Sequence, residues 1–355
     1  MNTDSFISNE NINVVEALSK IDKCGYGILY IVNEKNQLIG AVSDGDIRRW
    51  IIKTNDLKAS VSLYMNKSPK YVFEHERDKA ASIAVKYPIN SLPVLNNKRE
   101  IIDIIVFKNN NDLTAEVKCK KDLDVPCVIM AGGKGTRLYP YTKVLPKPLI
   151  PIGDTPILER IMTRFSDYGV KKFYLTVNYK KNMIRSYFDE IKPNYEIVYV
   201  EEDKPLGTGG SIKLIHDSFD VPIIVANCDA LINADYKDLY DFHVSSGNDI
   251  TVVSSLKNIT VPYGVLKTRE NGELIEMEEK PKLSYFINTG MYIINPDTIK
   301  LIPDDKMYHM THLVEDVKKN GGRVGMYPVS EDSFLDMGEF DEMRRMEEKL
   351  NIVSK

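Results

Sequence analysis

The sequence lacks paired cysteines, long apolar runs and a strong charge of either sign. Its four cysteines, at positions 24, 119, 127 and 228, are scattered along 355 residues without a CxxC pair, which fits a reducing compartment better than a disulfide framework. No apolar run approaches the ~20 residues that a membrane-spanning helix needs. The polar start, MNTDSFISNENINV, has no basic-then-apolar secretory pattern. These absences predict a cytoplasmic protein without a membrane partner.

The formal net charge is only −4, so nothing in the overall charge predicts a nucleic-acid partner, and any basic function must be local. The composition, 43% hydrophobic and 28% charged, is typical of a globular protein. A length of 355 residues is long for one domain and suits two.

An internal repeat occupies most of residues 1–120. ILYIVNEKNQLIGAVSDGD begins at Ile28, and SLPVLNNKREIIDIIVFKN begins at Ser91, an offset of 63 residues. In each copy a polar turn separates two short apolar strands, and a helix-like segment precedes them (NVVEALSKI and DKAASIAVKY). Each copy is too small to bury its apolar face alone, so we expect the two copies to pack on each other.

The segment LIGAVSDGDIRR at residues 38–49 resembles the strand–turn–helix ending of cystathionine-β-synthase (CBS) domains. The resemblance covers residues 5–112 and predicts a tandem pair, with copies at about 1–62 and 63–112. It implies that Ser43 and Asp46 bind the ribose of an adenine or guanine nucleotide. Alternatively, these two side chains only cap the helix that follows.

The second copy places Val106 and Asn109 at the equivalent positions. Because valine lacks a hydroxyl group, we expect no second nucleotide site there. CBS pairs associate through helical faces, so the resemblance also implies a homodimer or a higher homo-oligomer. The polar segment NNNDLTAEVKCKKDLD, residues 109–124, is interpreted as a linker.

Residues 123–355 have a different pattern, in which strand-like segments alternate with helix-like ones. The predicted strands are VPCVIM, KKFYLTVN, YEIVYVEE and VPIIVANCD, and the predicted helices include TPILERIMTRFSDYG, NMIRSYFDEI and SIKLIHDSF. For the first helix, Thr155 suits the N-cap, Pro156 the first helical position and Gly169 the end. Such alternation predicts an α/β fold with a mostly parallel sheet and ligands at the carboxyl ends of its strands.

The first of these strands runs into MAGGKGTRLYPYTKVLPKPLIPIGDTPIL, residues 130–158. Gly132, Gly133 and Gly135 would let the backbone adopt positive φ and bring N–H groups to an anion. The spacing is neither GxxxxGK[ST] nor GxGxxG. Arg137 can fork two phosphate oxygens, and flanking prolines restrict the backbone around Lys147. Together these residues predict a phosphate site rather than a surface turn.

This stretch, with LGTGG at 206–210, NCD at 227–229 and NTGMYI at 288–293, resembles the sugar-1-phosphate nucleotidyltransferases, which have a Rossmann-like fold. The resemblance extends from 125 to 355. It implies nucleotide binding by Ala131, Gly132, Gly133, Gly135, Thr136, Gly207 and Thr208. It implies sugar-phosphate binding by Tyr263, Gly264, Glu279, Lys280, Asn288 and Thr289.

The implied reaction is attack by a sugar 1-phosphate on the α-phosphorus of a nucleoside triphosphate, with pyrophosphate leaving. Such chemistry depends on positioning and charge neutralisation. Arg137 would hold the pyrophosphate and Lys147 the α-phosphate region. Asp229 and Asp336 would share Mg²⁺, which prefers few carboxylates plus phosphate oxygens. Alternatively, Asp229 caps a strand end and Asp336 is a turn residue.

Three further points bear on specificity and on alternatives. A CBS pair ahead of such a domain resembles the glucosamine-1-phosphate guanylyltransferase branch of bacterial legionaminic acid biosynthesis, which implies GTP and glucosamine 1-phosphate. Mannose or heptose 1-phosphate is the first alternative, and a nucleotide-sensing protein with an inactive catalytic half is the second. His309 and His312 have HxxH spacing, but we interpret them as the start of a helix rather than a metal site.

Overall fold

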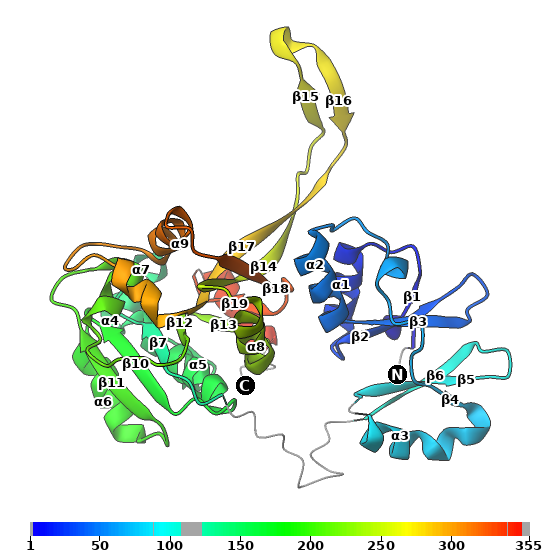
Figure 1. Ribbon diagram of the computed structural model, residues 1–355, viewed down its shortest axis with the longest axis horizontal. Coiled ribbons are helices and arrows are strands. Elements are labelled where there is room, and N and C mark those ends of the chain that lie inside the picture. The colour runs from blue at the N-terminus through cyan, green and yellow to red at the C-terminus, as the bar shows by residue number, and fades with distance from the viewer. Residues whose placement is uncertain (1–2, 88, 108–122, 339, 350–355) are drawn as a thin grey trace. The chain divides into compact units, whose positions relative to one another are not determined.

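A computed structural model of the chain describes residues 3–87, 89–107, 123–338 and 340–349. The chain divides into two compact units, one comprising residues 1–118 and 257–285 and the other residues 119–256 and 286–355. We call them unit 1 and unit 2. Figure 1 shows their elements, and each unit is described by itself.

Unit 1 contains two three-stranded sheets with the same topology. The first has β1 (Ile7–Asn9) parallel to β2 (Ile28–Val32) and β2 antiparallel to β3 (Leu38–Ser43). The second has β4 (Val72–Phe73) parallel to β5 (Ser91–Leu95) and β5 antiparallel to β6 (Ile101–Val106). The sequence repeat is therefore a repeat of structure, and β2 and β5 begin 63 residues apart.

The two copies also pack on each other, as the sequence predicts. One apolar cluster contains Tyr30 and Leu38 from the first copy together with Leu95 and Ile104 from the second. The Tyr30 hydroxyl donates to the Ser91 carbonyl at 2.9 Å. The helices of the pair are α1 (Val14–Cys24), α2 (Asp44–Thr54) and α3 (Ala80–Lys86). Asn109 and nearly all of the predicted linker lie outside the described residues.

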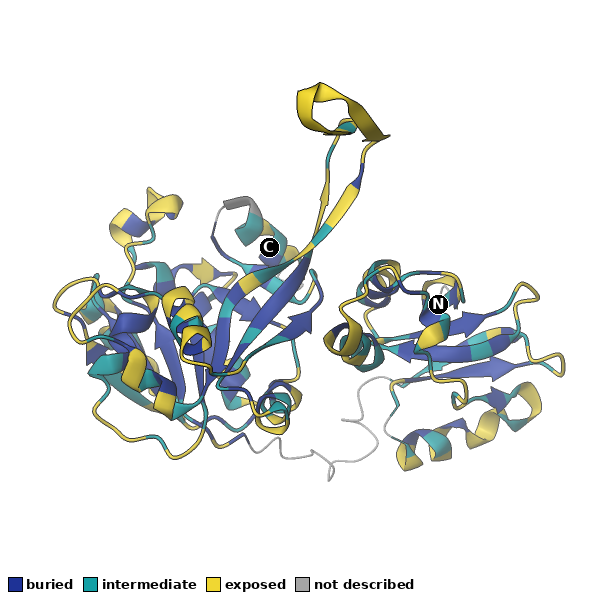
Figure 2. Ribbon diagram, turned by 45° about the horizontal axis from the view of Figure 1, so that its top comes forward, coloured by how far each residue is buried: buried dark blue, intermediate teal, exposed yellow. Residues whose placement is uncertain are grey.

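A two-stranded hairpin completes unit 1. Its strands β15 (Val265–Thr268) and β16 (Leu274–Glu278) are antiparallel, with Leu266 opposite Met277 and Lys267 opposite Glu276. Every residue of β16 is exposed, as Figure 2 shows by colour. The chain reaches this hairpin by β14 (Ile250–Thr260) and leaves it by β17 (Lys282–Ile294).

Unit 2 is built on a seven-stranded sheet with the order β11-β10-β7-β12-β17-β14-β18. The strands not yet given are β7 (Cys127–Met130), β10 (Lys172–Val177), β11 (Glu196–Glu201), β12 (Ile223–Asn227) and β18 (Val324–Val329). The first four strands in the order are mutually parallel, and β17 is antiparallel to β12. The prediction of a mostly parallel α/β sheet is confirmed.

Helices cover both faces of this sheet because its central strands alternate their buried side chains between two apolar clusters. Cys127 and Ile129 of β7 pack with α5 (Ile157–Ser166), α6 (Lys181–Ile191) and α8 (Tyr236–Ser246). Val128 and Met130 pack on the other side with α9 (Met310–Lys319). Buried runs of this kind are typical of parallel strands. Among the described elements, no helix has the length and apolar character needed to cross a bilayer.

Two helix predictions need correction. The N-cap of α5 is Pro156 rather than Thr155, because Thr155 pairs with Ile152 in a short antiparallel bridge, and Asp167 is the C-cap. SIKLIHDSF forms only a 3₁₀ turn, Ser211–Leu214. Beyond that turn Asp217 accepts hydrogen bonds from Tyr174 and Lys172 of β10, so tertiary contacts replace the rest of the helix.

Candidate active site

A cavity of about 420 Å³ lies where the parallel strands of unit 2 end. Its lining includes Met130 at the end of β7, Asn227 at the end of β12 and Glu202 just after β11. Carboxyl ends of parallel strands meet at one edge of a sheet, which is the usual ligand position in this architecture. The remaining lining residues are Gly132, Gly133, Gly135, Thr136, Arg137, Leu138, Lys147, Thr176, Pro205, Gly207, Thr208, Cys228 and Asp229.

The glycine-rich turn borders this cavity, but its glycines have different roles. Only Gly135 has a positive φ, of 62°, and a side chain there would come within 2.9 Å of the Lys147 Cβ atom. Gly132 is required for space, because a Cβ atom would lie 2.7 Å from Glu202 Oε1. Gly133 has open space around it. The prediction of positive φ at all three glycines is therefore wrong for Gly132 and Gly133.

Ala131 differs from the rest of the predicted nucleotide-binding set. Its backbone N–H donates to the Thr176 carbonyl at 2.9 Å, and it is fully buried and absent from the cavity lining. It extends the sheet pairing by one residue and cannot offer that N–H to a ligand.

The two predicted cations both line the cavity. Arg137 is exposed in the 3₁₀ turn Thr136–Leu138. Lys147 opens another 3₁₀ turn between two buried prolines, and its ammonium group forms an ion pair with the Asp229 carboxylate. Only 16% of the Lys147 side chain and 19% of the Asp229 side chain are exposed. An ion pair this buried is screened less by water than a surface pair.

A small sheet brings the two predicted metal ligands together. Strand β13 (Ala230–Ile232) is antiparallel to β19 (Phe334–Asp336), with Ala230 opposite Asp336. The backbone N–H of Met337 donates to the Asp229 carbonyl at 2.9 Å. Burial, followed by the charge of Asp229, raises the pKa of Asp336. The two carboxylates are thus electrostatically coupled, although Asp336 is absent from the cavity lining.

A divalent cation would fit this pair, since two carboxylates supply the oxygen ligands that Mg²⁺ prefers and leave the other positions to phosphate or water. The Lys147 ammonium group already places a positive charge beside the Asp229 carboxylate. The described residues contain no group of three or more His, Cys, Asp and Glu side chains able to hold a metal. Cys228, beside the pair, is buried, and burial raises the pKa of its thiol to about 12, so it stays neutral.

The LGTGG loop is fixed against the start of α9. Gly207 has a φ of 78°, and a side chain there would come within 2.7 Å of the Tyr308 carbonyl oxygen. The backbone N–H of Thr208 donates to His309 Nδ1 at 3.4 Å, and its hydroxyl accepts from Met310 N at 3.1 Å. His309 precedes α9 and its N–H donates to His312 Nδ1 at 3.2 Å. The two histidines therefore belong to the helix start, as interpreted from the sequence.

Glu202 lines the cavity and was missed from the sequence. It is 7% exposed, and burial raises its pKa. Its neighbour Glu201 is exposed and pairs with Lys181 and Arg185. A signal was present: side chains alternate along a strand, so Glu202 shares a face with the buried Val200.

The predicted sugar-phosphate residues occupy two places. Tyr263, Gly264, Glu279 and Lys280 are exposed on the hairpin segment of unit 1, where the Lys280 ammonium lies 3.9 Å from Glu279 Oε1. Asn288 and Thr289 lie on β17 and are absent from the cavity lining.

The side chains of these two β17 residues are already engaged. The Thr289 hydroxyl donates to the Val253 carbonyl at 2.7 Å, and the Asn288 amide donates to the Tyr292 hydroxyl at 2.5 Å. A role in sugar binding stays a prediction for all six residues.

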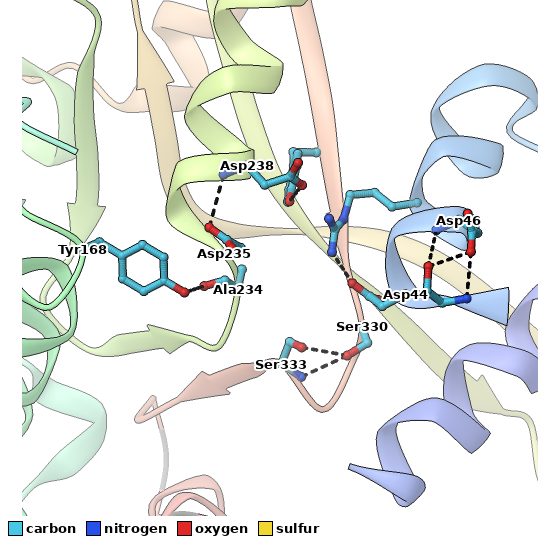
Figure 3. Close-up of polar contacts among 11 residues, drawn as sticks. Asp44, Asp46, Tyr168, Ala234, Asp235, Asp238, Ser330 and Ser333 are labelled. Carbon is cyan, nitrogen blue, oxygen red and sulfur yellow. Dashed lines mark hydrogen bonds and ion pairs between the residues drawn. The ribbon is translucent and has the colours of Figure 1, made fainter. Parts of the chain in front are cut away.

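In unit 1, Ser43 and Asp46 form a capping box at the start of α2. Figure 3 labels Asp46 and draws its hydrogen bonds as dashed lines. Ser43 Oγ accepts from Asp46 N at 3.2 Å, and Asp46 Oδ2 accepts from Ser43 N at 2.9 Å and from Ser43 Oγ at 2.6 Å. Arg49 donates to Asp46 Oδ1 at 2.5 Å. The capping alternative is therefore what the structure shows, and nucleotide binding at this box stays a prediction.

The profile of the Nucleotidyl transferase family matches residues 127–351, which contain the sheet, the cavity and both aspartates. The chain belongs to this family. The CBS domain profile matches residues 1–53, so the family domain is preceded by a CBS domain. The profile covers the first copy of the structural repeat.

Sequence relatives agree with the family assignment. A mannose-1-phosphate guanyltransferase of Debaryomyces hansenii is 36% identical over 184 residues, which are 49% of this chain and 51% of the relative. A UTP–glucose-1-phosphate uridylyltransferase of Synechocystis is 33% identical over 202 residues, 52% of each chain. The chain thus spans about half the length of the curated relatives it matches.

Among solved structures, HddC from Yersinia pseudotuberculosis is 28% identical, with a TM-score of 0.50 over 64% of this chain and 99% of that protein.

Proposed function

We propose that this protein transfers a guanylyl group from GTP to a sugar 1-phosphate. An oxygen of the sugar phosphate attacks the α-phosphorus of GTP. The new P–O bond forms as the bond to the bridging β-phosphate oxygen breaks, and pyrophosphate leaves. The observation that carries this proposal is the convergence of the glycine-rich turn, Arg137 and the Lys147–Asp229 pair on one cavity.

The chain's own residues would act through charge and position. Arg137 is exposed at the cavity, where its planar guanidinium group can hold two oxygens of the leaving pyrophosphate. The buried prolines on either side of Lys147 restrict its backbone. Its ammonium group is already held at the cavity by the ion pair with Asp229, so it has little side-chain freedom left to lose when it meets the α-phosphate. Preorganised positive charge of this kind stabilises the charge that spreads in the transition state.

Mg²⁺ is the proposed cofactor, with Asp229 and Asp336 as its protein ligands. When bound, it would neutralise charge on the phosphate oxygens. Lys147 and the cation both need the Asp229 carboxylate. Asp229 would therefore hold the cation, and Lys147, which lines the same cavity, would meet the substrate phosphate.

Glucosamine 1-phosphate is the proposed acceptor, because a CBS domain ahead of the catalytic unit is the architecture that the sequence resemblance identifies. Mannose 1-phosphate is the second candidate, since the name of the 36% identical relative specifies it. Glu279 and Lys280 are proposed to meet the sugar hydroxyl and the sugar phosphate. Their exposed position leaves both side chains accessible to a ligand.

Unit 1 is proposed to regulate or assemble the protein. Ser43 and Asp46 would hold the ribose of an adenine or guanine nucleotide, and the CBS pair would form a homodimer. Calorimetry of the full chain with ATP tests the first proposal, since GTP would also bind the proposed catalytic cavity. Light scattering at micromolar concentration tests the second, and a monomer there would count against it.

The catalytic proposal is tested by a matrix of five nucleoside triphosphates against glucosamine, mannose, heptose and glucose 1-phosphates, measured as pyrophosphate release with Mg²⁺. We expect release above background with GTP and glucosamine 1-phosphate. Release with mannose 1-phosphate alone would make mannose 1-phosphate the acceptor instead. No release with any pair would refute the proposal that the protein is a nucleotidyl-transferring enzyme.

A further inference from the structure

The chain just before Lys147 is tied to residues that follow β10. A four-residue helix, α4 (Tyr141–Val144), lies between the glycine-rich turn and Lys147. The Lys180 ammonium group donates to the Lys143 carbonyl at 2.6 Å and to the Val144 carbonyl at 2.7 Å. The last carbonyls of a helix have no partner within the helix, and a nearby cation satisfies them. Both acceptors are backbone groups, so substitution of Lys143 or Val144 leaves them in place.

Tyr179 makes two further contacts with the same part of the chain. Its hydroxyl donates to the Thr142 carbonyl at 3.1 Å, and its backbone N–H donates to the Gly132 carbonyl at 3.4 Å. Thr142 is fully buried, and its own hydroxyl donates to the Gly135 carbonyl at 2.9 Å. Two adjacent residues therefore hold the glycine-rich turn and α4 against the end of β10.

Lys180 makes its two bonds from an unfavourable backbone conformation. Its φ is 53°, in the left-handed region that glycine and asparagine adopt more easily than lysine. Lys192, at the other end of α6, has a φ of 45° and is exposed. Helix α6 is thus flanked by two left-handed lysines, and the first of them holds α4. Backbone strain of this kind persists where the surrounding contacts require it and is concentrated at functional sites.

We propose that Tyr179 and Lys180 are positioning residues for the transfer reaction. This inference rests on the proposed function and deepens it. Both residues are absent from the cavity lining, so they act through the chain that they hold. Two residues separate Val144 from Lys147. A misplacement of about 1 Å can reduce a rate ~100-fold, so fixing α4 fixes the point from which Lys147 reaches the α-phosphate.

The test replaces Lys180 by glycine in the full-length protein. Glycine tolerates a positive φ, so Lys180→Gly removes the ammonium group without adding backbone strain. With both substrates saturating, kcat for pyrophosphate release should fall about 10-fold or more. KM for GTP should change less than kcat, because Lys147 acts on charge that develops in the transition state. Tm should fall by no more than about 4 °C, since relief of strain offsets the lost bonds.

Lys192→Gly is the matched control, because it makes the same replacement at the other left-handed lysine. It should leave kcat within about twofold of the natural value. Tyr179→Phe removes one hydroxyl group and should lower kcat about 3- to 10-fold, the range for one neutral hydrogen bond. Unchanged kcat in Lys180→Gly would overturn the inference, as would an equal loss in Lys192→Gly. If Lys180→Gly does not fold, unchanged kcat in Tyr179→Phe would overturn it.

Hydrogen exchange of the full chain without substrate separates failure of this inference from failure of the proposed function. Amides of residues 136–147 should exchange about 10-fold faster in Lys180→Gly than in the natural protein, the scale for losing a bond to a charged group. Lys192→Gly should exchange there at the natural rate. If no substrate pair releases pyrophosphate, this difference would support the anchor while refuting the reaction. Equal exchange in Lys180→Gly and the natural protein would overturn the inference whatever the activity.

Discussion

Two regions of the molecule place polar side chains just after a buried strand. One is the start of α2 in unit 1, and the other is the cavity around the glycine-rich turn in unit 2. At α2 the side chains satisfy one another: Ser43 and Asp46 exchange hydrogen bonds, and Arg49 neutralises the carboxylate. In the cavity, Arg137 and Glu202 have no such mutual arrangement, and both face space that a ligand can fill. A strand end becomes a binding site when its polar groups are positioned but not satisfied by the protein.

The largest expected effect removes a positioned charge from the cavity. Lys147→Ala should lower kcat/KM by at least ~100-fold, the scale for one preorganised electrostatic donor. Lys143→Ala is the control, because Lys143 is exposed and absent from the cavity lining. Steady-state pyrophosphate release measures both variants. If Lys147→Ala turned over nearly as fast as the natural protein, Lys147 would have no role in catalysis. The cavity would then resemble the start of α2, where polar side chains act only within the protein.

A metal titration examines the aspartate pair. Asp229→Asn should raise the Mg²⁺ concentration for half-maximal activity about 10-fold or more, because an amide is a weaker ligand than a carboxylate for a hard cation. Asp332→Asn serves as the control, since Asp332 is exposed and pairs with Lys349. An unchanged Mg²⁺ dependence would mean that Asp229 only caps the strand end, as Ser43 caps α2.

Two neighbouring glycines give a sharper comparison within the cavity. Gly132→Ala should reduce kcat/KM for GTP about 10-fold, because the new methyl group would meet Glu202 Oε1 at 2.7 Å. Gly133→Ala meets nothing within 4 Å and should leave kcat/KM nearly unchanged. Equal effects of the two substitutions would show that backbone freedom, and not space beside Glu202, makes glycine necessary.

The cap in unit 1 should matter for stability more than for turnover. Ser43→Ala should cost about 1 kcal/mol, the usual value for losing an N-cap, and leave kcat/KM within twofold without added regulatory nucleotide. Thermal unfolding of the full chain measures the first effect. Loss of the calorimetric ATP signal in this variant would instead give the box a binding role, so that the two strand ends would be alike.

The smallest expected effect is a pH-dependent change in thermal stability when Glu202 is replaced. Burial raises its folded-state pKa, so folding is disfavoured as pH rises through the interval between the unfolded and folded pKa values. Glu202→Gln should therefore raise Tm at pH 7 by about 2–4 °C, equivalent to about 1 kcal/mol. The gain should vanish at pH 4, where the natural carboxyl is protonated. A gain of equal size at both pH values would exclude this electrostatic cause.

Local sequence patterns predicted much of the fold because they depend on side chains close in the chain. The apolar runs predicted the four mutually parallel strands β7, β10, β11 and β12 to within two residues at each end. The start of α5 was misplaced because Thr155 pairs with Ile152, and the helix after LGTGG was overextended because Asp217 bonds to β10. These contacts depend on how the chain folds back on itself, which the apolar and polar pattern of one segment does not predict.

The site residues that lie in or near the glycine-rich turn could be predicted from the sequence, and those contributed by distant strands could not. Arg137 and Lys147 were found from composition and spacing, and both line the cavity. Glu202 was missed because two adjacent glutamates resemble a solvated strand end. Asp336 was suggested only by the family resemblance, since its position beside Asp229 depends on pairing between strands about a hundred residues apart.

That pairing has a consequence for how the protein is made. Strand β19 supplies Asp336, and Met337, the next residue, donates its backbone N–H to the Asp229 carbonyl. A ribosome must therefore release nearly all of unit 2 before the aspartate pair can assemble. A nascent chain halted before β19 would already carry the glycine-rich turn, Arg137 and Lys147. Under the proposed function, the residues that meet the phosphate groups would thus be synthesised before the second proposed metal ligand.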